Sequence, residues 1–170
     1  NANRTSSTLN VSAGKTYYIK VNERSQNYFA PYKLETYFTE LSYNDSNEPN
    51  GATNNAPTIE LNSSITALIG FGDDEVDYYK FTPTQNGTFS FKVTNLNPSG
   101  TDYGSIGNVY LLNPDNLNES LQTILNNYLG PNANRTSSTL NVLAGKTYYI
   151  KVNERSQNYS APYKLETYFQ

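Results

Sequence analysis

The chain lacks four residue types that carry much of protein chemistry: its 170 residues include no cysteine, methionine, tryptophan or histidine. Without histidine and cysteine there can be no Ser-His-Asp triad, thiol nucleophile, Cys/His zinc site or disulfide. Only carboxylates, lysine, tyrosine and hydroxyl groups remain for catalysis. We therefore expect a protein that is not an enzyme.

Positive charge is also scarce, since 12 Lys and Arg residues face 15 Asp and Glu residues and the net charge is -3. Proteins that bind nucleic acid usually present a basic patch, so we expect no nucleic-acid partner. No apolar run approaches the roughly 20 residues that a membrane-spanning helix needs. The sequence therefore predicts no membrane span.

Aromatic residues are plentiful, with 16 Tyr and 7 Phe, although only 36% of the residues are hydrophobic. Tyrosine buries a large apolar ring while its hydroxyl group keeps a hydrogen-bond partner. A packed core can therefore form despite the low hydrophobic content.

An internal repeat dominates the sequence. Residues 132–169 repeat residues 1–38 at an offset of 131 (132 minus 1), with only two differences. Ser12 corresponds to Leu143, and Phe29 corresponds to Ser160. Such near-identity indicates a recent duplication or an array of units that is kept homogeneous.

The offset sets the predicted domain organisation. We expect residues 39–170 to form one complete unit and residues 1–38 to be the C-terminal third of a preceding repeat. The favoured parent protein is an elongated extracellular tandem array. The alternative is a single duplication inside an otherwise unrelated protein.

Alternation of apolar and polar residues with a period of two predicts an all-β chain. In Thr147–Val152 and Thr88–Val93 every second residue is apolar and should face a core. Turn signals separate these runs from the other predicted strands. Those strands are Thr58–Leu61, Ser64–Leu68, Asp77–Phe81, Gly107–Leu112, Ser138–Val142 and Lys164–Phe169. The expected fold is an antiparallel, jelly-roll-like β-sandwich.

The segment Asn116–Gly130 departs from this alternation. Its leucines, Ile124 and Tyr128 fall at helical spacing, and Gly130-Pro131 is a typical helix stop. The spacing predicts one short helix. The alternative is a strand over Leu121–Leu125 followed by a loop.

Four segments, in the same order along the chain, resemble the pre-peptidase C-terminal domain, a β-sandwich of secreted bacterial proteins that includes collagen-binding domains. They are Glu48-Pro49-Asn50 with Ala56, the run Gly-Asp-Asp-Glu-Val-Asp-Tyr-Tyr-Lys-Phe at 72–81, the run Leu-Ala-Gly-Lys-Thr-Tyr-Tyr-Ile-Lys-Val at 143–152, and Tyr163-Lys164-Leu165. The resemblance covers about 120 residues. It implies a jelly-roll-like sandwich and, in some members, a calcium ion that pins the N-terminal segment to the body.

The residues themselves point the same way. Calcium takes six to eight oxygen ligands from carboxylates, amides and carbonyls. Asp74 and Asp77 lie next to a glycine on a predicted loop and can converge with Glu48 and Asn50. We therefore expect these four residues to form a calcium site. The alternative is that the acids are turn residues and caps.

The sequence departs from the family pattern at two places near this site. Ser46 stands where a second Glu often precedes, and Gly51 stands where an Asp follows the Asn. The neighbouring acids Asp73 and Glu75 either compensate for these losses or are simply solvated.

Four tyrosines in the last third of the chain suggest an exposed aromatic strip that binds collagen or a glycan. They are Tyr149, Tyr159, Tyr163 and Tyr168. The alternative is that they are outward-facing tyrosines without a ligand, which are common on β-sandwiches.

These observations favour a non-catalytic repeat module of a secreted or surface-displayed bacterial protein, acting as a stalk, fibre or adhesin unit. The second interpretation is a collagen- or polysaccharide-binding accessory domain of a secreted hydrolase. For residues 1–38, with expected strands at Ser7–Val11, Thr16–Val21 and Lys33–Phe38, we expect pairing with another copy of the chain in a head-to-tail or strand-exchanged assembly. The alternative is closure of residues 1–38 on residues 39–131 of the same chain.

Overall fold

The structure is a computed structural model that describes residues 4–6, 16–22, 31–37, 45–70, 74–97, 104–155 and 160–170. The chain divides into two compact units, Asn1–Leu41 and Ser42–Gln170. All the strands assigned within the described residues lie in the second unit.

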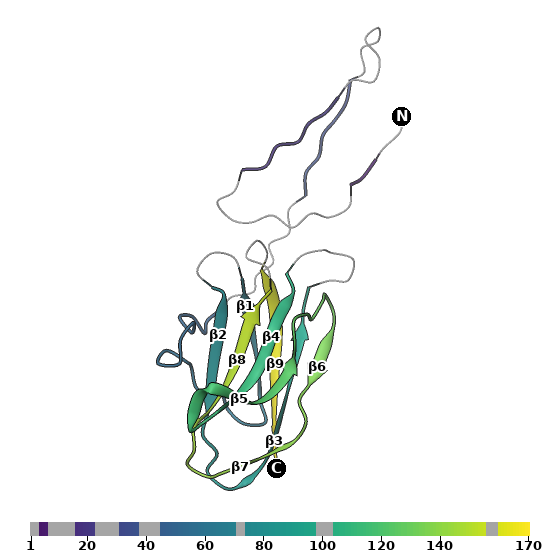
Figure 1. The fold of residues 1–170 in the computed structure, drawn as a ribbon. Helices are drawn as coiled ribbons and strands as arrows, with labels where there is room; N and C mark the ends of the chain where they lie inside the picture. Colours follow the sequence, from purple (N-terminus) through teal and green to yellow (C-terminus); the bar gives the residue numbers. More distant parts are fainter. Residues whose placement is uncertain are drawn as a thin grey trace. The chain divides into compact units, whose positions relative to one another are not determined.

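The second unit is built from two antiparallel sheets (Figure 1). The four-stranded sheet has the order β2 (Val76–Phe81), β8 (Tyr148–Glu154), β4 (Ile106–Asn113) and β5 (Asn116–Leu125). The five-stranded sheet has the order β1 (Ser64–Ile69), β9 (Ala161–Phe169), β3 (Gly87–Asn95) and β6 (Asn134–Thr136), with β7 (Leu140–Val142) also paired to β3. This arrangement confirms the predicted all-β sandwich.

The core lies between the two sheets and is built by the alternation that the sequence predicts. The expected inward residues of β3 and β8 are all at most 3% exposed: Phe89, Phe91, Val93, Tyr148, Ile150 and Val152. Phe81 of one sheet stacks on Phe89 of the other, with ring centroids 4.1 Å apart. Stacked aromatic rings therefore form part of the contact between the layers.

The last third of the chain supplies the central strand of each sheet. Strand β8 lies between β2 and β4, and strand β9 lies between β1 and β3. Each of these two strands therefore makes a hydrogen-bonded ladder on both sides. Removal of residues 132–169 would leave both sheets split.

The predicted helix in Asn116–Gly130 is wrong, because Asn116–Leu125 forms the edge strand β5. The pairing of β5 with β4 shifts register at three places. Such irregularities interrupt the alternation of side chains, and most of β5 is exposed on both faces, so its leucines do not follow a period of two.

Within the described part of the chain, no helix is long and apolar enough to cross a membrane.

The predicted strand Thr58–Leu61 is reduced to a single parallel bridge between Thr58 and Lys80. The amide of Ile59 donates to the carbonyl of Lys80 at 2.9 Å, and Ile59 is 5% exposed. The segment therefore covers the outer edge of β2 without adding a regular strand.

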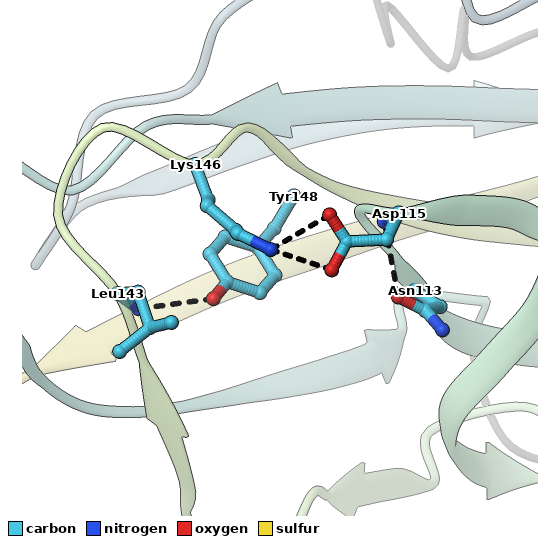
Figure 2. A network of polar contacts seen from close by, with 5 residues as sticks. All are labelled: Asn113, Asp115, Leu143, Lys146 and Tyr148. Carbon is cyan, nitrogen blue, oxygen red and sulfur yellow. Dashed lines mark hydrogen bonds and ion pairs between the residues drawn. The ribbon is translucent and has the colours of Figure 1, made fainter.

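The turn between β7 and β8 is linked by polar contacts to the turn between β4 and β5 (Figure 2). Gly145 has φ of +74°, a conformation that favours glycine. The next residue, Lys146, forms an ion pair with Asp115 of the β4–β5 turn, and its Nζ lies 2.7 Å from Oδ1. The Tyr148 hydroxyl accepts from the amide of Leu143 at 2.9 Å. The ion pair is largely solvent-exposed, so its main effect is to join two turns rather than to add much stability.

In the first unit, the expected strand Ser7–Val11 lies outside the described residues. The described parts of the other two, 16–22 and 31–37, are assigned no strand. Their apolar side chains are exposed: Ile19 is 62% exposed, whereas its counterpart Ile150 in β8 is 0% exposed. The same sequence therefore forms a core strand in one unit and lies open in the other.

Candidate metal centre

The segment that precedes β1 is hydrogen-bonded to an edge strand of each sheet. Asp45 accepts from the amide of Leu68 in β1 at 2.7 Å through Oδ2. The carbonyl of Asn50 accepts from the amide of Tyr78 in β2 at 2.9 Å. The segment therefore bridges the two sheets at one side of the sandwich.

Strand β2 places a carboxylate on the core side of its sheet. Asp77 alternates with the buried Tyr79 and Phe81, so its side chain points inward and is 0% exposed. Asp74 comes just before the strand, and its carbonyl accepts from the amide of Gly70 at 2.7 Å. The loop between β1 and β2 is thereby closed next to the buried carboxylate.

Three of the four predicted metal ligands meet at this point. One carboxylate oxygen each from Glu48, Asp74 and Asp77 lies within 4.8 Å of the others. Glu48 is exposed, Asp74 is half-buried and Asp77 is buried, so the cluster runs from solvent into the protein. Of the neighbouring acids, Glu75 is exposed and Asp73 lies outside the described residues.

A chain of hydrogen bonds links Asn50, the fourth predicted ligand, to Asp77. The side-chain amide of Asn50 donates to the Tyr79 hydroxyl at 3.3 Å, and the hydroxyls of Tyr79 and Tyr163 lie 2.7 Å apart. The Tyr163 hydroxyl donates to Oδ2 of Asp77. The sequence patterns do not predict the role of either tyrosine here, although Tyr79 lies in the predicted strand Asp77–Phe81.

Two buried oxygens at this site have no hydrogen-bond partner among the described residues: Oδ1 of Asn50 and Oδ1 of Asp77. Both residues are 0% exposed. A buried acceptor without a partner costs about 1–3 kcal/mol, so native proteins rarely leave one unsatisfied. A cation held by these oxygens would remove that cost.

Burial and mutual repulsion raise the pKa values of the two aspartates. Burial first, and then the charge of Glu48, raise the pKa of Asp74 to about 7. Burial also raises the pKa of Asp77 to about 9, with the Tyr163 hydrogen bond opposing the shift and Asp74 adding to it. The cluster therefore resists full ionisation near neutral pH unless a positive charge joins it.

The chemistry of the donor set fits a hard cation. All the side chains offered are carboxylates and an amide, with oxygen as the donor atom, and calcium prefers such ligands. No sulfur or imidazole ligand exists in the sequence to favour zinc or copper. If calcium binds here, Glu48, Asn50, Asp74 and Asp77 would hold it.

The predicted aromatic strip does not form. Tyr163 is 0% exposed, because its ring lies in the core and its hydroxyl serves Asp77. Tyr149 lies on the outer face of the four-stranded sheet, while Tyr168, 43% exposed, lies on the outer face of the five-stranded sheet. Tyr159 lies outside the described residues. The prediction of one continuous strip is therefore wrong for Tyr163 and for the pairing of Tyr149 with Tyr168.

Comparison with known proteins finds similarity among solved structures. The pre-peptidase C-terminal domain of a collagenase from Bacillus anthracis is 19% identical, with 66% of this chain and 93% of that chain covered and a TM-score of 0.49. PliG from Aeromonas hydrophila, a periplasmic inhibitor of g-type lysozyme, is 12% identical, with 68% and 96% covered and a TM-score of 0.42. A β-glucosidase from Paenibacillus barengoltzii is 15% identical, with 65% of this chain but 11% of that chain covered and a TM-score of 0.31.

The chain is thus similar to a pre-peptidase C-terminal domain, as the sequence motifs indicate. No protein-family model matches the chain, and neither does any curated protein sequence.

Proposed function

We propose that the chain is a non-catalytic, calcium-binding β-sandwich repeat of a secreted or surface-displayed bacterial protein, where it serves as a stalk, fibre or adhesin unit. The observation that carries the calcium assignment is the cluster of Glu48, Asp74 and Asp77 within 4.8 Å, next to two buried oxygens without partners. Calcium there would tie the segment before β1 to the start of β2.

The proposed structural role of calcium follows from the position of the cluster. Glu48 and Asn50 belong to the segment before β1, whereas Asp74 and Asp77 belong to β2 and the loop that leads to it. An ion bound by all four would add a further link between these two parts of the chain, which the hydrogen bond from the Tyr78 amide to the Asn50 carbonyl already joins. It would also offset the repulsion that raises the two aspartate pKa values.

The repeat organisation supports a role in a multi-unit protein. Residues 1–38 would be the C-terminal third of a preceding unit, and residues 39–170 would form the complete one. In such a protein the units follow one another head to tail, with strand pairing completing each sandwich. The missing histidine and cysteine favour a mechanical or binding role over catalysis.

Thermal and urea unfolding in millimolar calcium and in chelator test the calcium proposal. Calcium that binds only the folded state at a hundredfold excess over its Kd should raise the free energy of unfolding by about 2.7 kcal/mol. The Asp77→Asn variant should lose this gain, because it removes the buried carboxylate while keeping the shape of the side chain.

The matched control is Asp115→Asn, which removes a carboxylate in the exposed β4–β5 turn. It should keep the full response to calcium. The calcium proposal would be rejected if the natural chain unfolds identically in calcium and in chelator.

A second candidate is an accessory module that binds collagen or a polysaccharide. It is favoured by exposed tyrosines on the sandwich, Tyr168 at 43% and Tyr128 at 50%, the latter with the Arg155 guanidinium 4.5 Å from its ring centroid. Co-sedimentation with fibrillar collagen and with insoluble polysaccharides tests it. Binding that Tyr168→Ala or Tyr128→Ala abolishes would support this candidate.

A further inference from the structure

The two copies of the repeated sequence differ in their surroundings, and the second copy shows what the first one fits. Residues 147–153 and 162–168 lie in β8 and β9, the central strands of the two sheets. Residues 16–22 and 31–37 carry the same sequence at the offset of 131. The partners of β8 and β9 are β2 and β4 on one side of the core and β1 and β3 on the other. We call residues 39–131, which carry β1 to β5, the framework.

The exposed side chains of the first copy match buried ones in the second. Ile19, Val21 and Leu34 are 62%, 50% and 54% exposed. Their counterparts Ile150, Val152 and Leu165 are 0%, 0% and 1% exposed. Large apolar side chains that are exposed in one copy and buried in the other indicate a surface that a partner covers.

We propose that residues 1–38 bind a second framework, with residues 16–22 in the place of β8 and residues 31–37 in the place of β9. The partner is a polypeptide with the sequence of residues 39–131 that lacks its own 132–169. This inference rests on the proposed repeat organisation and specifies the surface, the partner and the register of that organisation.

Specific contacts of the complete unit would be reproduced. Lys151 lies over the ring of Tyr78, with Nζ 5.5 Å from the centroid, and Lys20 would take this place. Tyr163 donates to Asp77, and Tyr32, 70% exposed, would supply the same hydroxyl. The second framework would thus also gain the buried support of its metal cluster.

Of the two sequence differences between the copies, one costs little in this placement and the other removes one hydrogen bond. Leu143 is 50% exposed, so the serine found at residue 12 would remove little buried surface there. Ser160 donates to the carbonyl of Gly70 at 3.0 Å, and Phe29 would lose that hydrogen bond. The core positions are the same in both copies.

A count of frameworks and repeated segments excludes simple exchange between identical chains as the stable state. Each chain has one framework but two copies of the repeated segment. When residues 1–38 displace residues 132–169, from the same chain or from another, one apolar copy stays uncovered. Only a framework without its own 132–169 lowers the number of uncovered copies, and for that reason we assign it as the partner.

The test extends the full chain by a second copy of residues 39–131, placed directly before Asn1 at the natural spacing. Backbone amides of residues 16–22 and 31–37 should gain protection from hydrogen exchange in the extended chain and remain unprotected in the original chain. Ile19→Asp should remove this protection, because it buries a charge in the new core, but should leave the original chain unchanged.

Disulfide cross-linking tests the register. Because the chain has no natural cysteine, only the introduced cysteines can form a disulfide. Tyr78 faces Lys151 across β2 and β8, and its amide donates away from β8 to Asn50 at 2.9 Å. Such non-hydrogen-bonded pairs have Cα atoms about 4.5 Å apart, within disulfide reach. Cysteine at Lys20 should therefore cross-link to cysteine at the Tyr78 position of the added framework.

The matched control is cysteine at the Lys80 position of the added framework, which faces Tyr149 and hence Tyr18. It should cross-link with Y18C and not with K20C. Unprotected amides in the extended chain, or equal cross-linking in both registers, would overturn the inference, as would full protection already present in the original chain.

Calcium plays no part in these two readouts. If the calcium proposal alone fails, protection and cross-linking still appear in chelator. If the strand proposal alone fails, the complete unit still responds to calcium.

Discussion

Tyr163 sets the hydrogen bonding at the buried end of the acidic cluster, because its hydroxyl contacts both Asp77 and Tyr79. In Tyr163→Phe, Oδ2 of Asp77 loses its donor and Tyr79 loses its hydroxyl neighbour. We expect the free energy of unfolding to fall by about 1–3 kcal/mol, as measured by urea denaturation. Tyr168→Phe, on the outer face of the same strand, should change it by less than about 0.5 kcal/mol. Equal losses in the two variants would contradict this role of Tyr163.

The raised aspartate pKa values predict an unusual pH dependence in chelator. In the folded state the pKa values are about 7 for Asp74 and about 9 for Asp77, against an ordinary value of 3.8. At pH values between the ordinary pKa of 3.8 and the raised pKa of about 9, the folded state holds more protons than the unfolded state. The stability of the folded state therefore falls as pH rises through this range. We expect the free energy of unfolding of the natural chain to decrease from about pH 5 to about pH 9.

Urea denaturation at several pH values, with Asp77→Asn as the reference, isolates this effect. The variant should show a shallower decrease, because the residue with the larger shift is gone. Saturating calcium should also flatten the decrease in the natural chain, because the cation favours the ionised carboxylates. Parallel pH profiles for the natural chain and the variant would disprove the assignment.

At this scale, the sequence predicts the members of the acidic cluster better than the residues that support them. Glu48, Asp74 and Asp77 were expected together from residue type and spacing, and they lie together. Tyr163 was expected on the surface, since alternation shows which face a residue is on but not which neighbours it meets. Its hydrogen bond to Asp77 joins residues 86 positions apart, a separation that local patterns do not encode.

The strands differ in how strongly the sequence specifies them. Strands β3 and β8 face a core on one side, so burial imposes alternation and the sequence predicts them. Strand β5 lies at a sheet edge, is mostly exposed and shifts register against β4, so no burial pattern marks it. Helical spacing arose there from leucines such as Leu117 and Leu121, which are 36% and 43% exposed.

The two copies of one strand sequence provide a matched experiment on tertiary context. Ile150→Ala should lower the free energy of unfolding by about 2–5 kcal/mol, because it opens a cavity between the sheets. Ile19→Ala changes the same residue in the same local sequence, but that side chain is 62% exposed. We expect a change below about 0.5 kcal/mol in urea denaturation. Comparable losses at the two sites would show that residues 16–22 are packed in the free chain.

The whole molecule consists of two units of very different completeness. The structure divides the chain into the units Asn1–Leu41 and Ser42–Gln170, and the assignment of residues 1–38 to a preceding repeat stays a prediction. This division explains why the same residues are buried in one unit and open in the other: only the second unit includes a framework. Alternation alone shows that residues 16–22 and 31–37 suit a sheet with one buried face, but it does not show which strands pair with them.

The division predicts that residues 1–41 contribute nothing to the stability of the complete unit. All the assigned strands and the described core lie in Ser42–Gln170, and the described apolar residues of the first unit are exposed. A chain that starts at Ser42 should therefore unfold in urea with the same midpoint and the same slope as the full chain. The slope is informative, because it scales with the surface that unfolding exposes. A lower midpoint in the shorter chain would mean that residues 1–41 pack on the sandwich, and a smaller slope would mean that they unfold with it. Either result would also weaken the inference that these residues await a framework of their own.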